Sequence, residues 1–169
     1  TRSSTFMMAN DWKMAEEWGN RAIALARQFD APDVEVHALN NIGSALVDSG
    51  QVHGFEMLQQ SLDLAIKHGL HDQVARVYIN GSAASVRNRM LPQAETFLVD
   101  GTRYAKQHDL DSVACNMLGG FAHVRMLQGR LIEAELIAQE AISLPNMPPQ
   151  ARLPAQTAQA AIDVMRDVA

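Results

Sequence analysis

The sequence is poor in two kinds of residue that characterise whole classes of protein. Among its 169 residues there is one cysteine, and only 5% are aromatic. The single Cys115 excludes an intrachain disulfide framework and fits a reducing, cytoplasmic compartment. The low aromatic content, together with abundant Ala, Leu, Gln and Met, disfavours a β-sandwich and favours closely packed helices.

Concentrated charge and long apolar runs are also missing. The formal net charge is -5, and acidic and basic residues are dispersed without a run of four like charges. We therefore expect no direct nucleic-acid contact and no binding to an anionic membrane surface. No apolar run approaches the roughly 20 residues of a membrane-spanning helix, and the first ten residues lack the pattern of a secretory signal. The sequence predicts a soluble protein without a membrane span.

The motifs of common catalytic and metal sites are absent as well. There is no Cys-x-x-Cys, no His-Glu-x-x-His and no Gly-x-x-x-x-Gly-Lys, and Gly119-Gly120 has no phosphate-loop context. His68 and His71 are separated by Gly69-Leu70, which interrupts the helix that would align them. We expect no metal, no cofactor and no enzymatic activity; convergence of Cys115 or a serine with a histidine stays open as the alternative.

What the sequence does contain is a repeat, clearest in residues 129–142. Gly129 supplies a turn, and small residues at Ala134, Ala138 and Ala141 leave room for a neighbouring helix. Steps of 40, 39 and 40 residues relate two of these positions to counterparts upstream: Ala134 to Ala94, Phe55 and Ala15, and Ala141 to Gly101, Leu62 and Ala22. A step of this length with small residues at helix-packing positions resembles the tetratricopeptide repeat (TPR) and its longer-helix relatives.

The repeat predicts an all-α chain of nine helices without a strand, because every segment follows the 3.6-residue period. The resemblance implies a tetratricopeptide-like α-solenoid of antiparallel helix pairs in a right-handed superhelix, forming one domain over residues 1–169. Its parts are a half repeat at 1–33, repeats at about 34–72, 73–111 and 112–149, and a half repeat at 150–169. A turn is expected at Asn10-Asp11, a loop at 145–149, and a last helix from about Pro154 to Val168.

The two ends read as interruptions of the array. The chain begins at Thr1 and ends within a helical pattern, so we expect it to be a piece of a longer protein. Phe6, Met7 and Met8 then lack a partner helix, and the last helix has lost its neighbour. Uncapped apolar faces of this kind predict association into homo-oligomers through the ends.

In stacked helix pairs, the first helix of each pair lines the concave side. The polar candidates that project there are His37, Asn40, Ser44, Arg76, Arg87, Asn116 and His123. Arg76 and Arg87 are eleven residues apart, which places them on nearly one helix face about 16 Å from each other. These donors favour a small anionic or hydroxylated effector, or a protein or peptide partner. The alternative is that the arginines only balance acids such as Asp48.

Three phrases carry a more particular resemblance: His37–Leu46, Ser61–Ala65 and Gly69–Asn80. They look like the helical-repeat region of large bacterial LuxR-type, maltose-activator-like regulators, which join an ATPase, a TPR-like sensor arm and a DNA-binding helix-turn-helix. Neither the ATPase motif nor the DNA reader is in this sequence. The resemblance implies a protein- or ligand-binding scaffold or sensor arm of a cytoplasmic signalling or transcriptional regulator. A stand-alone TPR adaptor for protein–protein interaction is the alternative.

Overall fold

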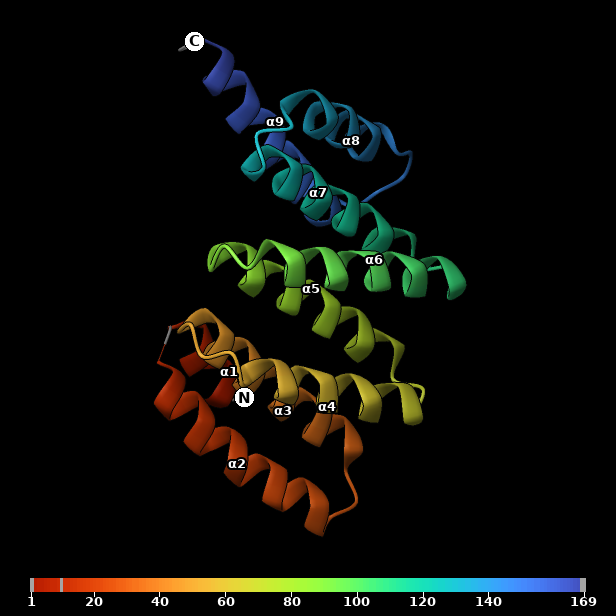
Figure 1. The fold of residues 1–169 in the computed structure, drawn as a ribbon. Helices are drawn as coiled ribbons and strands as arrows, with labels where there is room; N and C mark the ends of the chain where they lie inside the picture. The colour runs from red at the N-terminus through yellow and green to blue at the C-terminus, as the bar shows by residue number, and fades with distance from the viewer. Residues whose placement is uncertain (1, 10, 168–169) are drawn as a thin grey trace. The chain divides into compact units, whose positions relative to one another are not determined.

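The computed structural model describes residues 2–9 and 11–167, and these residues form nine α-helices and no strand (Figure 1). The prediction of an all-α chain is confirmed. The helices are α1 (Arg2–Met8), α2 (Trp12–Gln28), α3 (Pro32–Asp48), α4 (Gly54–Lys67), α5 (His71–Arg87), α6 (Leu91–Gln107), α7 (Asp111–Leu127), α8 (Leu131–Ser143) and α9 (Pro149–Asp167).

The start of the last helix differs from the prediction. It begins at Pro149, where proline suits the first helical position, and not at Pro154. Pro154 lies inside α9 and packs against α7, since a Cβ added to Gly119 would come within 2.8 Å of the Pro154 Cβ. The expected turn at Asn10 and the expected helix end at Val168 lie outside the described residues.

The helices group into two compact units, each of which is described by itself. The first is Thr1–Met90, with α1 to α5, and the second is Leu91–Ala169, with α6 to α9. The boundary falls between the two helices of the predicted repeat at 73–111.

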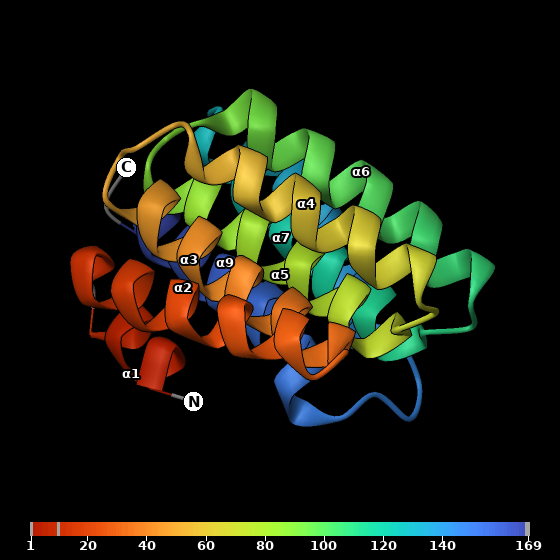
Figure 2. The same ribbon diagram turned by 90° about the horizontal axis from the view of Figure 1, so that it is seen from below.

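In the first unit α3 is the central helix, and it contacts α1, α2, α4 and α5. Figure 2 shows α1 beside α2 and α3. Every residue of α3 from Ala38 to Val47 is buried, so the helix has no solvent-facing stripe over that length. Its Leu39, Ile42 and Leu46 form an apolar cluster with Ile23 of α2. Covering α3 from several sides is what determines which of its polar residues can reach a ligand.

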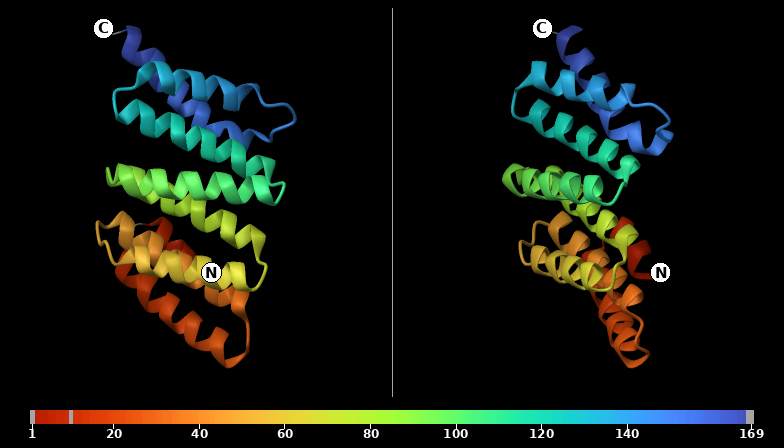
Figure 3. Two further views of the ribbon diagram at one scale, coloured as in Figure 1. Left: turned by 45° about the vertical axis from the view of Figure 1, so that its right-hand side comes forward. Right: turned by 90° about the vertical axis from the view of Figure 1, so that its right-hand side faces the viewer.

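In the second unit α7 contacts α6, α8 and α9, and α8 also contacts α9 (Figure 3). The core here is built largely from alanine, with Ala122, Ala138 and Ala155 all completely buried. Small side chains allow the helix backbones to approach closely, as the sequence pattern predicts. Ala134, expected to be nearly fully buried, has no exposed surface and packs in a cluster with Met126 and Ile162.

The turns between helices recur with a constant local geometry. One residue in each of six turns has a left-handed backbone conformation, and these residues follow one another at steps of 20, 19, 20, 20 and 20: Asp30, Gly50, Gly69, Arg89, Asp109 and Gly129. The turns predicted at Gly50, Gly69 and Gly129 are therefore present. The one short step lies between Gly50 and Gly69, so the helix in that interval sits one residue early relative to the others.

This short step corrects the predicted counterparts of Ala134 and Ala141 in the first complete repeat. The closely packed small residues there are Gly54 and Ser61, both buried, rather than Phe55 and Leu62. Gly54 comes four residues after its left-handed turn residue, whereas Ala134 comes five after Gly129. The assumed step of 39 residues between the second and third copies moved the register by one.

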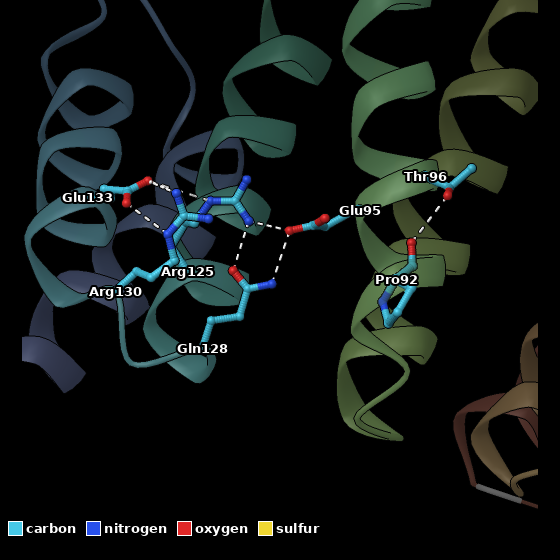
Figure 4. Close-up of polar contacts among 7 residues, drawn as sticks. All are labelled: Pro92, Glu95, Thr96, Arg125, Gln128, Arg130 and Glu133. Carbon is cyan, nitrogen blue, oxygen red and sulfur yellow. Dashed lines mark hydrogen bonds and ion pairs between the residues drawn. The ribbon is translucent and has the colours of Figure 1, made fainter.

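A network of polar side chains ties α6 to the turn between α7 and α8 in the second unit (Figure 4). The Arg125 guanidinium donates to the Glu95 carboxylate and, at 2.9 Å, to the Gln128 side-chain carbonyl. The Gln128 amide donates to the same Glu95 oxygen at 3.1 Å. Beside them, Arg130 grips Glu133 with two hydrogen bonds of 2.7 and 2.6 Å. Hydrogen bonds from Arg125 and Gln128 lower the pKa of Glu95.

We expect Glu95→Gln to lower the free energy of unfolding at pH 7 by about 1 kcal/mol, since the network is partly exposed to solvent. Folding lowers the pKa of Glu95, so its contribution is complete above the ordinary carboxyl pKa of about 4.3 and is lost as the pH falls through the folded-state value. Urea unfolding at a series of pH values should show parent and variant converging in acid. Glu140→Gln, on an exposed residue of α8, is the control; an equal difference at pH 3 and 7 would contradict the assignment.

Candidate functional site

A hollow of about 460 Å³ lies in the first unit, where α1, α3 and α5 approach one another. Its lining residues are Met7, Met8, Ser44, Asp48, Asn80, Arg87 and Asn88. They come from the C-terminal half of each of the three helices and from the residue that follows α5. Two of the residues predicted from the sequence, Ser44 and Arg87, are among them.

An ion pair forms one wall of the hollow. The Arg87 guanidinium donates through Nε and Nη2 to the two Asp48 carboxylate oxygens, each at 2.8 Å. The Asp48 side chain is 16% exposed and that of Arg87 58%, so the carboxylate is covered while part of the guanidinium still faces solvent. The role left open in the sequence, in which the arginine balances Asp48, is therefore the one Arg87 has here. The pair makes this wall close to neutral.

The remaining lining combines amide and thioether groups. Asn80 is half-buried on α5, and Asn88 caps that helix by donating its amide to the Ala84 carbonyl at 3.1 Å. Met7 and Met8 of α1 are flexible side chains that can adapt to different ligand shapes. Ser44, at 2% exposure, lies at the base and donates to the Asn40 side chain at 3.4 Å.

The structure corrects what the sequence predicted for Asn40. It is completely buried, so it does not project into an open groove, and its amide nitrogen has no partner among the described residues. The reason is that α1 packs along this face of α3. Ser4 of α1 lies 3.0 Å from the His37 Nε2 and accepts a hydrogen bond of 3.0 Å from Asn41. Burial and the charge of Arg76 lower the pKa of His37, which favours the neutral imidazole.

The same packing corrects the expectation that α1 has no partner helix. It contacts both α2 and α3, and its Phe6 and Met7 are half-buried. Only Met8, at 82% exposure, is as open as predicted. Short polar side chains make this close packing workable, because the buried Ser3 hydroxyl donates to the Ala15 carbonyl of α2 at 3.1 Å.

The other predicted residues do not line the hollow. Arg76 is exposed in the N-terminal half of α5 and forms no ion pair with any residue that the structure describes. Asn116 and His123 are half-buried on α7, in the second unit. The structure thus brings Ser44 and Arg87 to one site, beside four residues that the sequence analysis did not select: Met7, Met8, Asn80 and Asn88. Asn80 directly follows Ile79, which was assigned to this face, so its polar neighbour was a usable signal.

Searches for other kinds of site found little. Residues 2–9 and 11–167 hold no group of three or more His, Cys, Asp or Glu side chains placed to bind a metal ion. Over the same residues no helix combines the length and apolar character needed to cross a bilayer. Cys115 is buried, with its sulfur 3.5 Å from the Ala141 and Ala151 carbonyls, and burial raises the pKa of its thiol. It is a packing residue without an activating base.

Comparison with known proteins finds no family model that matches the chain and no curated protein that matches it. The chemistry of the hollow itself is therefore the basis for any functional conclusion.

Proposed function

We propose that this chain is a binding scaffold, a TPR-like α-solenoid that holds a peptide segment of a partner protein against the α1, α3 and α5 surface. The observation that carries the proposal is the hollow between these three alternate helices. In the predicted repeat each of them is the first helix of its pair, which is the helix that lines the concave side of such arrays. The regular spacing of left-handed turn residues supports the same architecture.

The lining favours a peptide over a strongly anionic effector. Arg87 is already paired with Asp48, so it offers only part of its hydrogen-bonding capacity to a ligand. The amides of Asn80 and Asn88 can donate to and accept from a peptide backbone. Met7 and Met8 supply a deformable apolar contact for side chains. A small hydroxylated effector uses the same donors and is the second candidate for this hollow.

Two biological settings fit a scaffold of this kind. One is the sensor arm of a cytoplasmic LuxR-type, maltose-activator-like regulator, and the other is a stand-alone adaptor. The reading frame on either side of the chain separates them. An ATPase module upstream and a helix-turn-helix downstream support the regulator, whereas nearby start and stop codons support the adaptor.

The binding proposal is tested by selecting ten-residue peptides from a random display library on the immobilised chain. Asn80→Ala should weaken the selected peptides by about tenfold, which corresponds to about 1.4 kcal/mol, because one amide partner of the backbone is lost. Arg87→Ala should weaken them as well, and Arg76→Ala, on the same helix but outside the hollow, is the matched control. Isothermal titration calorimetry gives the affinities, and circular dichroism checks that the variants fold.

Peptides whose affinity is unchanged by Asn80→Ala and Arg87→Ala would place binding elsewhere and remove the proposal. A library that yields no binder while hydroxylated small molecules stabilise the chain would favour the second candidate. In that case Asn80→Ala should abolish the stabilisation.

A further inference from the structure

The second unit contains a different cavity, of about 490 Å³, at the end where α6 finishes, α7 begins and α8 finishes. We propose that it binds a free α-amino acid with an apolar or aromatic side chain. The lining residues are Thr102, Lys106, Asp111, Ala114, Leu118, Glu140, Leu144, Pro145, Asn146 and Met147. This site is independent of the hollow in the first unit, and the inference does not depend on the scaffold function.

One part of the lining is apolar. Leu118, Leu144 and Met147 are partly buried and pack on the alanine-rich core between α7, α8 and α9. Their remaining exposed surface faces a concave space whose volume lies within the range usual for small-molecule sites. Burying a Leu- or Phe-sized ligand side chain against such surface is favourable by about 1.5–3 kcal/mol.

The rest of the lining carries charges of both signs. Lys106, Asp111 and Glu140 are exposed, and none of them forms an ion pair with another residue in the described part of the chain. In the same unit Arg125, Arg130 and Arg166 are each paired with a glutamate. An ammonium for Asp111 or Glu140 and a carboxylate for Lys106 are the two charged groups of an amino acid.

A buried hydroxyl gives the site an unused hydrogen-bonding group. The Thr102 Oγ1 is inaccessible to solvent and has no hydrogen-bond partner among the described residues. Leaving such a group unsatisfied is unfavourable, so a ligand that supplies an N–H or a carboxylate oxygen gains affinity. Thr102 and Lys106 are four residues apart on α6 and hence on one helix face. The hydroxyl and the ammonium therefore present themselves together to one carboxylate.

The test measures the binding of L-leucine and L-phenylalanine to the whole chain by isothermal titration calorimetry, beside phenethylamine and 3-phenylpropionate, which lack one charged group each. One of the two amino acids should bind at least tenfold more tightly than its single-charge analogues. Lys106→Met and Asp111→Asn should each weaken that amino acid by about tenfold. Lys67→Met, on exposed α4, is the matched control and should leave binding unchanged.

No heat of binding from either amino acid up to about 10 mM, a weaker affinity than 1 mM sites show, would overturn the proposal. Binding of phenethylamine as tight as that of phenylalanine, and insensitive to Lys106→Met, would also overturn it, because the site would then recognise only a cation. Thr102→Val, which keeps the side-chain shape, should reduce affinity without loss of thermal stability. A variant that binds like the parent would exclude the hydroxyl from the site.

Discussion

Gly43→Ala should lower the free energy of unfolding of the first unit by about 2 kcal/mol. At this position α3 crosses α4, and an added Cβ would lie 2.8 Å from the Gly54 carbonyl oxygen, 2.8 Å from the Leu58 Cγ and 2.9 Å from the Leu58 backbone nitrogen. Two of these neighbours are backbone atoms, so the helices themselves must move apart. Overpacking of this kind costs about 1–3 kcal/mol, and the better helix propensity of alanine offsets at most about 1 kcal/mol of it.

Urea unfolding followed by circular dichroism measures this difference. Gly54→Ala should behave in the same way, since its Cβ would meet the Gly43 carbonyl oxygen at 2.6 Å. Gly120→Ala is the matched control, because there the only atom that an added Cβ would meet closely is the Leu98 Cδ2, at the end of a flexible side chain. A Gly43→Ala variant as stable as the parent would show that the two helices do not cross in backbone contact.

Ala134→Leu should destabilise the second unit by roughly 1–3 kcal/mol. Ala134 has no exposed surface and lies between Met126 of α7 and Ile162 of α9. The three extra carbon atoms of leucine have no space there without displacing one of the helices. For a unit of this size, each kcal/mol corresponds to about 4–8 °C in melting temperature.

Ala160→Leu is the matched control for Ala134→Leu. Ala160 is exposed on α9, so leucine adds the same volume in a helix without a neighbour to displace. Thermal unfolding of the two variants should differ by several degrees. Equal melting temperatures would mean that the register of small residues in α8 does not set its packing.

The all-α class and the turn glycines were predictable because helical periodicity and left-handed turns are local properties of the sequence. The register in α4 was not, because one residue fewer between Gly50 and Gly69 leaves Phe55 and Gly54 as competing counterparts of Ala134. Burial decides between them, and burial is a property of the folded chain.

The candidate site was predictable to the extent that it depends on one helix. Ser44 and Arg87 were found from their positions along α3 and α5. The cover that α1 places over Asn40 was not, because periodicity shows that a face is polar without showing which helix will lie on it. Met7 and Met8 were missed for the same reason, as they were assigned to an unpartnered end.

The left-handed turn residues affect how chains of this kind can be recognised. Only half of the six are glycine, while Arg89, Asp30 and Asp109 adopt the same conformation with a side chain. A side chain there costs about 1–2 kcal/mol of strain, but glycine adds a comparable freedom to the unfolded chain, so the two choices nearly balance. Selection therefore exerts little pressure on residue identity at these turns. Distant relatives can diverge at them while keeping their spacing, and a 20-residue rhythm of turns is a more durable signature than any glycine motif.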